Sequence, residues 1–173
     1  IGQGSKFIEQ GQADRNSELQ YAIGHLVVWV PEQSPIDVER LGIQALLDPA
    51  ARKIALANPR HAPYGRAAEA ALKSLGIHDQ VVDKLVLGEN ISQTAQFVES
   101  GAADIGIIAL SLALAPGLQE NGRFWQVPLD AHPPLEQGCV ILNWAQDRSA
   151  TETFRGFVAG RRGREILQRF GFK

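Results

Sequence analysis

The stretch NPRHAPYGRAAEAAL, residues 58–72, starts a helix in a way that could bind an anion. Pro63 suits the first helical position, because proline has no N–H and its φ angle is preset for a helix. Ala62 then occupies the N-cap and has no side-chain oxygen to accept hydrogen bonds from the following amides. The amides of Tyr64 and Gly65 would therefore favour an oxyanion, as would the helix macrodipole. Gly65 would also let a ligand approach the backbone closely. The alternative is that water occupies these amides, as it does at many exposed helix starts.

A second helix start lies at GENISQ, residues 88–93. Asn90 can cap this helix and Gln93 can reach back as in a capping box, which is a purely structural interpretation. One cap satisfies one or two amides, so the Ile91 N–H is left to point outward. Two such starts that meet at one crevice favour a small oxyanion over a nucleotide, because the motifs GxGxxG and GxxxxGK[ST] are absent from the sequence.

Other residue types that carry chemistry do not form a recognisable set. Metal-ligand spacing such as HExxH is absent from the four histidines, which are His25, His61, His78 and His132. His61 adjoins the predicted anion site and could tune it, although a solvent-facing turn is the simpler role. Cys139, in the apolar run GCVIL, is expected to be a buried core thiol. No GxSxG elbow occurs, so we predict no catalytic residue, no metal and no cofactor.

Alternating strands and helices must position the two turns. A buried strand at 53–58 precedes a helix at 64–76, and a strand at 84–89 precedes a helix at 91–101. A third strand at 104–110 leads into a short helix at 111–115. This alternation predicts an α/β layer with a largely parallel sheet, whose βα turns gather beyond the carboxyl ends of the strands.

The remaining segments carry weaker signals. We expect a short helix and turn at 7–19, a strand at 23–31, a helix at 37–49, a loop-rich stretch after Pro116, a strand at 139–143, and helices at 150–159 and 161–170.

Composition limits the function. The 173 residues are 45% hydrophobic and 21% charged, with a formal net charge of −2, so no basic field indicates nucleic acid. The short basic segment AGRRGRE, residues 159–165, is expected to be a solvated loop. No apolar run approaches the ~18 residues that span a bilayer. The first residues lack a signal-peptide pattern, which leaves a cytoplasmic protein, a mature secreted chain and a trimmed chain as alternatives.

Four segments resemble the periplasmic molybdate-binding proteins of ABC transporters, in the branch with APYG at the anion site. They are YAIGHLVVW, IALANPRHAPYGRAAEAAL, LVLGENISQTAQFVESGAADIGIIAL and ILQRFGF, and the resemblance runs from Ser5 to Phe172. It implies the α/β fold of type II periplasmic binding proteins, in which two lobes joined by crossing strands close on molybdate or tungstate.

The resemblance also implies roles for individual residues. The backbone N–H groups of Tyr64 and Ile91 would donate to the oxyanion. Residues that support the site would be Pro63, Gly65, Asn90 and Ser92. Some relatives add a tyrosine hydroxyl from the strand after the second helix, but Ala109 occupies that place here, as expected for this branch.

Family members carry roughly a third of their length before the segment that begins here, and two loops of that region complete the anion shell. We therefore expect one complete α/β lobe plus the C-terminal part of the other: a remnant of lobe 1 and hinge entry at 1–24, lobe 2 at 25–135, and a return strand with the C-terminal helices of lobe 1 at 136–173. The chain would be a fragment or a truncated relative, with weak or undetectable anion binding. Exposed lobe-1 surfaces would favour self-association or marginal stability.

The predicted function is that of a periplasmic or extracytoplasmic solute-binding protein that delivers molybdate or tungstate to an ABC permease. It would perform no catalysis, bind no nucleic acid and not be embedded in the membrane. The alternative is a ligand-sensing effector domain of a transcription regulator, which would require a DNA-binding segment; none is visible in these residues.

Overall fold

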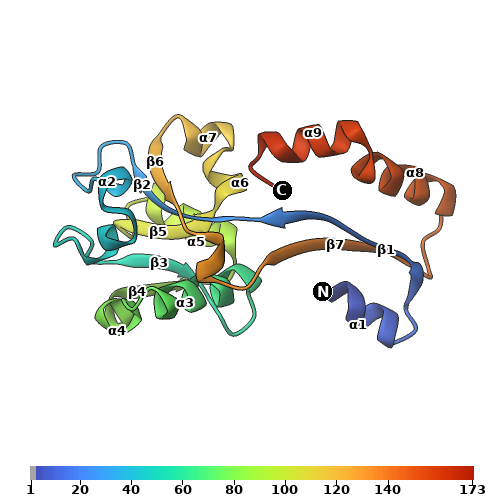
Figure 1. Cartoon of the computed structure of the whole chain (residues 1–173), viewed down its shortest axis with the longest axis horizontal. Helices are drawn as coiled ribbons and strands as arrows, with labels where there is room; N and C mark the ends of the chain where they lie inside the picture. The colour runs from blue at the N-terminus through green and yellow to red at the C-terminus, as the bar shows by residue number, and fades with distance from the viewer. Residues whose placement is uncertain (1–2) are drawn as a thin grey trace. The chain divides into compact units, whose positions relative to one another are not determined.

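The computed structural model describes residues 3–173 (Figure 1). The chain divides into two compact units. One is formed by the described residues up to Gly24 together with Glu136–Lys173, and the other is His25–Leu135. The first two residues of the predicted 1–24 segment lie outside the described range. The assignment of these units to the lobes of a binding protein remains a prediction.

The unit His25–Leu135 is built on a five-stranded sheet with the order β4-β3-β5-β2-β6. Its strands are β2 (Leu26–Pro31), β3 (Ile54–Ala57), β4 (Leu85–Gly88), β5 (Ile105–Ala109) and β6 (Gly122–Gln126). The strand β3 pairs in parallel with β4 and β5, whereas β2 pairs antiparallel with both β5 and β6. The sheet is therefore mixed rather than largely parallel by pairing, because β2 alone runs against the other four strands.

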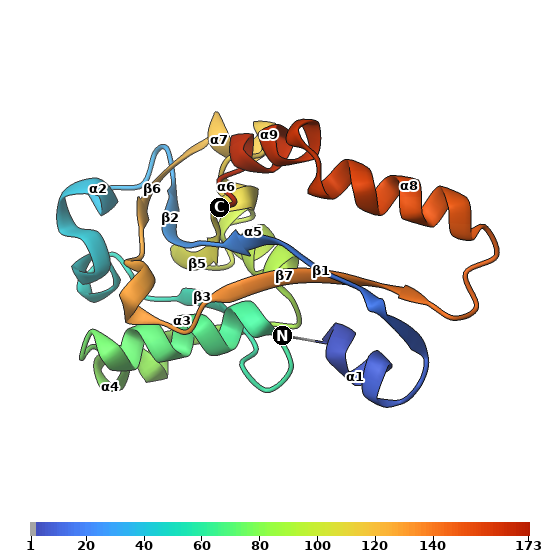
Figure 2. The ribbon, with the colours of Figure 1, turned by 45° about the vertical axis from the view of Figure 1, so that its right-hand side comes forward.

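Apolar residues on alternate positions of β2, β3 and β5 form two core layers. Leu26 and Val28 face one layer, while Val27 and Trp29 face the other. Successive side chains of a strand point to opposite faces, so a continuous apolar run such as that of β2 contributes to both layers. The helix α3 (Pro63–Ser74) packs into the first layer and α5 (Ile91–Glu99) into the second, so the two helices cover opposite faces of the sheet (Figure 2).

The connecting helices of this unit are short. They are α2 (Val38–Leu41), the 3₁₀ helix η1 (Gly42–Leu47), α4 (His78–Val81), η2 (Val82–Lys84), α6 (Leu110–Ala113), α7 (Pro116–Gln119) and η3 (Leu129–Ala131). The predicted single helix at 37–49 is wrong in detail, because Gly42 adopts a φ of 59° and ends α2 there. Residues 122–126, predicted as part of a loop-rich stretch, form the edge strand β6, whose residues are only half-buried or exposed.

The other unit contains a two-stranded sheet of β1 (Ala13–Gly24) and β7 (Leu135–Leu142), the helix α1 (Gln3–Glu9), and the tail helices α8 (Arg148–Ala159) and α9 (Arg161–Arg169). The two tail helices confirm the sequence prediction. The predicted strand at 23–31 is instead two strands that break at His25. Residues 13–19 belong to β1 rather than to a helix and turn, because their mostly polar side chains concealed the strand pattern.

Apolar side chains on the tail helices are exposed, as the sequence predicted. No residue of α8 is buried, and Phe154 keeps 67% of its surface accessible. Phe157, Ile166 and Phe170 are also exposed. Cys139 is half-buried in β7 rather than a core thiol, although desolvation still raises the pKa of the thiol. Within residues 3–173, no helix has the length and apolar content needed to cross a bilayer.

Candidate anion-binding site

The two predicted helix starts are adjacent in the structure. The strands β3 and β4 are parallel neighbours, and Ala57 at the end of β3 lies opposite Gly88 at the end of β4. The Asn58 N–H donates to the Gly88 carbonyl at 2.8 Å, which joins the first residue after β3 to the last residue of β4. The turns that lead into α3 and α5 therefore lie side by side at the carboxyl ends of these two strands.

The turn between β3 and α3 is organised by Asn58. Its backbone carbonyl accepts hydrogen bonds from the amides of His61 at 3.3 Å and Ala62 at 2.9 Å. Its side-chain Oδ1 accepts from the Arg60 amide at 3.0 Å. The turn is thus built from hydrogen bonds among its own residues, Asn58 to Ala62.

The start of α3 matches the sequence prediction. Pro63 is the first helical residue, and Ala62 is the N-cap with an extended backbone and no side-chain capping bond. Tyr64 is half-buried and packs against the core layer beneath α3. The ring is therefore part of the packing of the helix, while the backbone of Tyr64 belongs to the first turn.

The structure gives a reason for a glycine at position 65 that the sequence did not reveal. A Cβ at this position would overlap the carbonyl oxygen of Ala57 and lie 2.9 Å from the carbonyl carbon of Asn58. The glycine therefore lets α3 approach the end of β3, whereas the sequence suggested only room for a ligand. Gly88 serves the second turn similarly, because a Cβ there would lie 2.8 Å from Thr94 Oγ1 in α5.

The start of α5 is a capped helix. Asn90 Oδ1 accepts a hydrogen bond from the Gln93 amide at 2.9 Å. Gln93 Oε1 accepts from the Glu89 amide at 2.7 Å, one residue before the position that a standard capping box would satisfy. The amides of Ile91 and Ser92 have no hydrogen-bond acceptor among residues 3–173, so this cap leaves two donors at the helix start.

His61 connects the two turns. Its Nε2 lies 2.9 Å from the backbone carbonyl oxygen of Glu89 and 3.3 Å from Glu89 Oε2. The sequence suggested a solvent-facing turn residue, and the side chain is indeed partly exposed. The contact could not be found from the sequence, because the two residues are 28 positions apart and no pattern links them.

The arrangement offers neutral donors rather than reactive groups. Within the described part of the chain, no three His, Cys, Asp or Glu side chains come together to hold a metal ion. Ala109, at the place where some relatives are expected to carry a tyrosine, ends β5 and is buried. Backbone N–H groups at two helix starts can bind a compact anion through charge-assisted hydrogen bonds.

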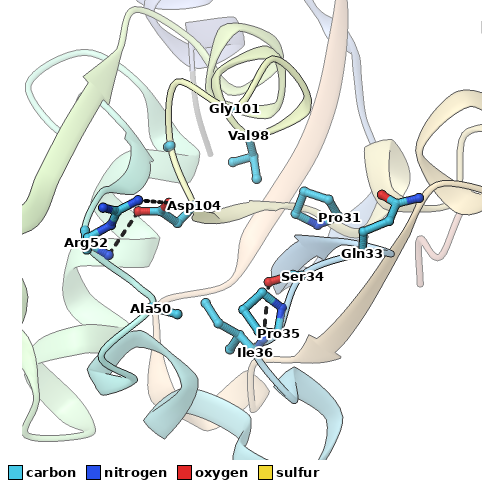
Figure 3. Close-up of a pocket in the computed structure, with 11 residues that line it drawn as sticks. Pro31, Gln33, Ser34, Pro35, Ile36, Ala50, Arg52, Val98, Gly101 and Asp104 are labelled. Atoms are coloured by element: carbon cyan, nitrogen blue, oxygen red, sulfur yellow. Dashed lines mark hydrogen bonds and ion pairs between the residues drawn. The ribbon is translucent and has the colours of Figure 1, made fainter.

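A pocket of about 470 Å³ lies at the other end of these strands, where β3 and β5 begin (Figure 3). It is lined by the last residue of β2, by residues that follow β2 or precede β3 and β5, and by Val98 of α5, and it includes none of the predicted site residues. Its carboxylate, Asp104, accepts hydrogen bonds from the amides of Arg52 at 3.0 Å and Lys53 at 2.8 Å. Asp104 therefore holds the start of β3 in place.

The sequence and the fold both match known proteins. Residues 3–173 match the family described as bacterial extracellular solute-binding protein. The molybdate-binding protein ModA of Rhodobacter capsulatus is 32% identical over 167 residues, which cover 96% of this chain and 64% of the relative. The molybdate-binding protein ModA of Azotobacter vinelandii is 33% identical over 167 residues, covering 96% of this chain and 65% of the relative.

The structural comparison agrees with the sequence comparison. The periplasmic molybdate-binding protein of Azotobacter vinelandii superposes with a TM-score of 0.87 and 29% identity, covering 98% of this chain and 73% of that one. The predicted α/β fold of type II periplasmic binding proteins is thereby confirmed. The chain spans slightly less than two thirds of the length of the two ModA relatives.

Proposed function

The chain belongs to the bacterial extracellular solute-binding protein family, and we propose that it binds a tetrahedral oxyanion, molybdate or tungstate, for delivery to an ABC permease. The observation that carries this proposal is the pair of adjacent helix starts at the ends of β3 and β4. The identity of the anion is proposed from the similarity to the two molybdate-binding ModA proteins.

In this proposal the backbone N–H groups of Tyr64 and Ile91 donate to the oxyanion. Pro63 and Gly65 support the first donor, because one presets the helix and the other lets it approach β3. The second donor is supported by the cap Asn90 and by Ser92, whose own amide lies in the same turn.

Selectivity would come from donor geometry rather than from charge. Neutral N–H groups at fixed positions fit an anion of one size, and a misfitting anion would leave buried donors unpaired. A site of this kind binds and releases its ligand without changing it. We therefore propose a transport function without catalysis, in an extracytoplasmic compartment.

The unit His25–Leu135 would be the complete anion-binding lobe, and the other unit would be part of a second lobe. The chain corresponds to 64–65% of the length of the ModA relatives, so the residues described here would supply only part of a donor shell. Two charge-assisted hydrogen bonds stabilise a complex by roughly 3–6 kcal/mol. A dissociation constant on the order of 1 mM follows for this chain alone.

Isothermal titration calorimetry of the 173-residue chain with molybdate, tungstate and sulfate tests the proposal. We expect weak binding of molybdate and tungstate and weaker binding of sulfate. Equal binding of all three anions would contradict a size-selective site. Tight, selective binding would instead show that the described residues form a complete donor shell.

Self-association is a further part of the proposal. The apolar side chains of Phe154, Phe157 and Ile166 on α8 and α9 are exposed, and exposed apolar side chains favour association between chains. We expect dimers or larger species whose proportion rises with concentration. Analytical ultracentrifugation at several concentrations measures this, and Phe154→Ser should shift the distribution toward monomer. A monomer at every concentration would contradict this part.

A further inference from the structure

We propose that His61 is a positioning residue of the oxyanion site, which sets the spacing between the two helix starts without touching the ligand. The inference rests on the proposed function, because the spacing matters only if both turns bind one anion. The contact between His61 and Glu89 joins the β3–α3 turn to the β4–α5 turn.

The contact fixes which ring nitrogen of His61 carries a proton. The Glu89 backbone oxygen can only accept a hydrogen bond, so His61 Nε2 must carry the proton in the 2.9 Å contact. Neutral and protonated imidazole both satisfy this requirement. The link therefore does not depend on a charged histidine.

The backbone of Glu89 is held at both its N–H and its carbonyl. Its N–H donates to Gln93 Oε1 at 2.7 Å, and its carbonyl accepts from His61. Glu89 directly precedes the cap Asn90, so a shift of Glu89 would move the start of α5. His61 precedes the cap Ala62 of α3 in the same way. One hydrogen bond thus joins the residues immediately before the two caps.

The ion pair between the same side chains contributes less. The side chain of His61 is 49% exposed and that of Glu89 is 74% exposed, so water and salt screen their charges. A separate hydrogen bond, from the Asn58 backbone N–H to the Gly88 carbonyl, joins the ends of β3 and β4. The strand ends and the two turns are therefore linked by separate hydrogen bonds. Only the link between the turns, from His61 to Glu89, uses a side chain that a substitution can change.

Two substitutions of His61 introduce the same side-chain group, a carboxamide, at two different lengths. His61→Gln places an amide N–H close to the position of Nε2, whereas His61→Asn places it close to Nδ1, too short to reach Glu89. Loss of a neutral hydrogen bond costs roughly 0.5–1.5 kcal/mol, which corresponds to about a 2- to 10-fold loss of affinity if it passes fully to binding. His78→Asn, on the helix α4, serves as the matched control.

Each variant of the 173-residue chain is measured in two ways. Hydrogen exchange without ligand reports the Glu89 and Gln93 amides, and a titration with molybdate reports affinity. We expect His61→Asn to speed exchange of these amides and to weaken molybdate binding. His61→Gln should restore both properties, and His78→Asn should leave both unchanged.

The inference is overturned if His61→Asn exchanges and binds like the unaltered chain, or if His61→Gln is as impaired as His61→Asn. If the unaltered chain binds no molybdate even at tens of millimolar, the proposed function with its affinity on the order of 1 mM is contradicted instead. In that case the exchange rates still decide whether His61 holds the two turns together.

Discussion

A substitution at Tyr64 can distinguish a backbone contact with the anion from a side-chain contact. Its ring packs against the core layer beneath α3, and its backbone lies in the first turn of the helix. If the backbone N–H is the donor to the oxyanion, Tyr64→Phe should change the affinity for molybdate by less than about twofold, because the ring and the amide are both retained. Calorimetry measures this, and a loss of about tenfold or more would show that the phenol hydroxyl carries the contact.

Asn90 allows the stability of α5 to be separated from anion binding. Its Oδ1 caps the helix through the Gln93 amide. Asn90→Ala should lower the free energy of unfolding by about 1 kcal/mol, because it removes the acceptor. Asn90→Asp should keep that stability, since aspartate caps equally well, yet weaken molybdate binding roughly tenfold through charge repulsion.

Urea denaturation and calorimetry on the two Asn90 variants give the two quantities independently. Equal molybdate affinity of Asn90→Asp and the unaltered chain would place the anion away from α5.

The helix α3 depends on its glycine for packing. A Cβ at Gly65 would overlap the Ala57 carbonyl oxygen, so Gly65→Ala should destabilise the chain by about 1–3 kcal/mol through overpacking. Gly156 offers a matched control, because it lies inside α8 and a Cβ there would meet no atom within 4 Å. Gly156→Ala should stabilise the chain by about 0.5–1 kcal/mol.

Thermal or urea denaturation distinguishes these two helix glycines. Gly65→Ala displaces the packing of α3 and would lower the affinity for molybdate whether or not the anion touches the glycine. The affinity of this variant therefore does not locate the anion. Similar stability changes at both positions would contradict the packing role of Gly65.

The elements around the site were predictable because their signals are local. Buried strands and amphipathic helices of the β3–α3–β4–α5–β5 segment alternate with clear periods, and Pro63 and Asn90 mark the helix starts. The strands β1 and β6 were missed, because one is mostly polar and the other has no fully buried residue. The break at Gly42 depends on a backbone angle that a helical period does not reveal.

Across the molecule, the contacts that join distant residues were beyond the sequence. The approach of Gly65 to Ala57 and the bond between His61 and Glu89 exist only because β3 and β4 are neighbours in the sheet. The resemblance to molybdate-binding proteins indicated which turns to compare, but it did not show how they are held together. The exposed apolar side chains of α8 and α9, by contrast, were expected from the resemblance, because the segment that would cover these helices is not among the residues of this chain.

The binding of one oxyanion by both turns is tested most directly by a titration followed through backbone amide NMR signals. The ¹⁵N-labelled chain is titrated with molybdate, and with sulfate at matched ionic strength, up to tens of millimolar. We predict that the largest saturable shifts occur at the amides of Tyr64, Gly65, Ile91 and Ser92, and that sulfate gives weaker binding. The account is contradicted if these amides do not respond, or if the largest shifts occur at the pocket around Arg52 and Asp104.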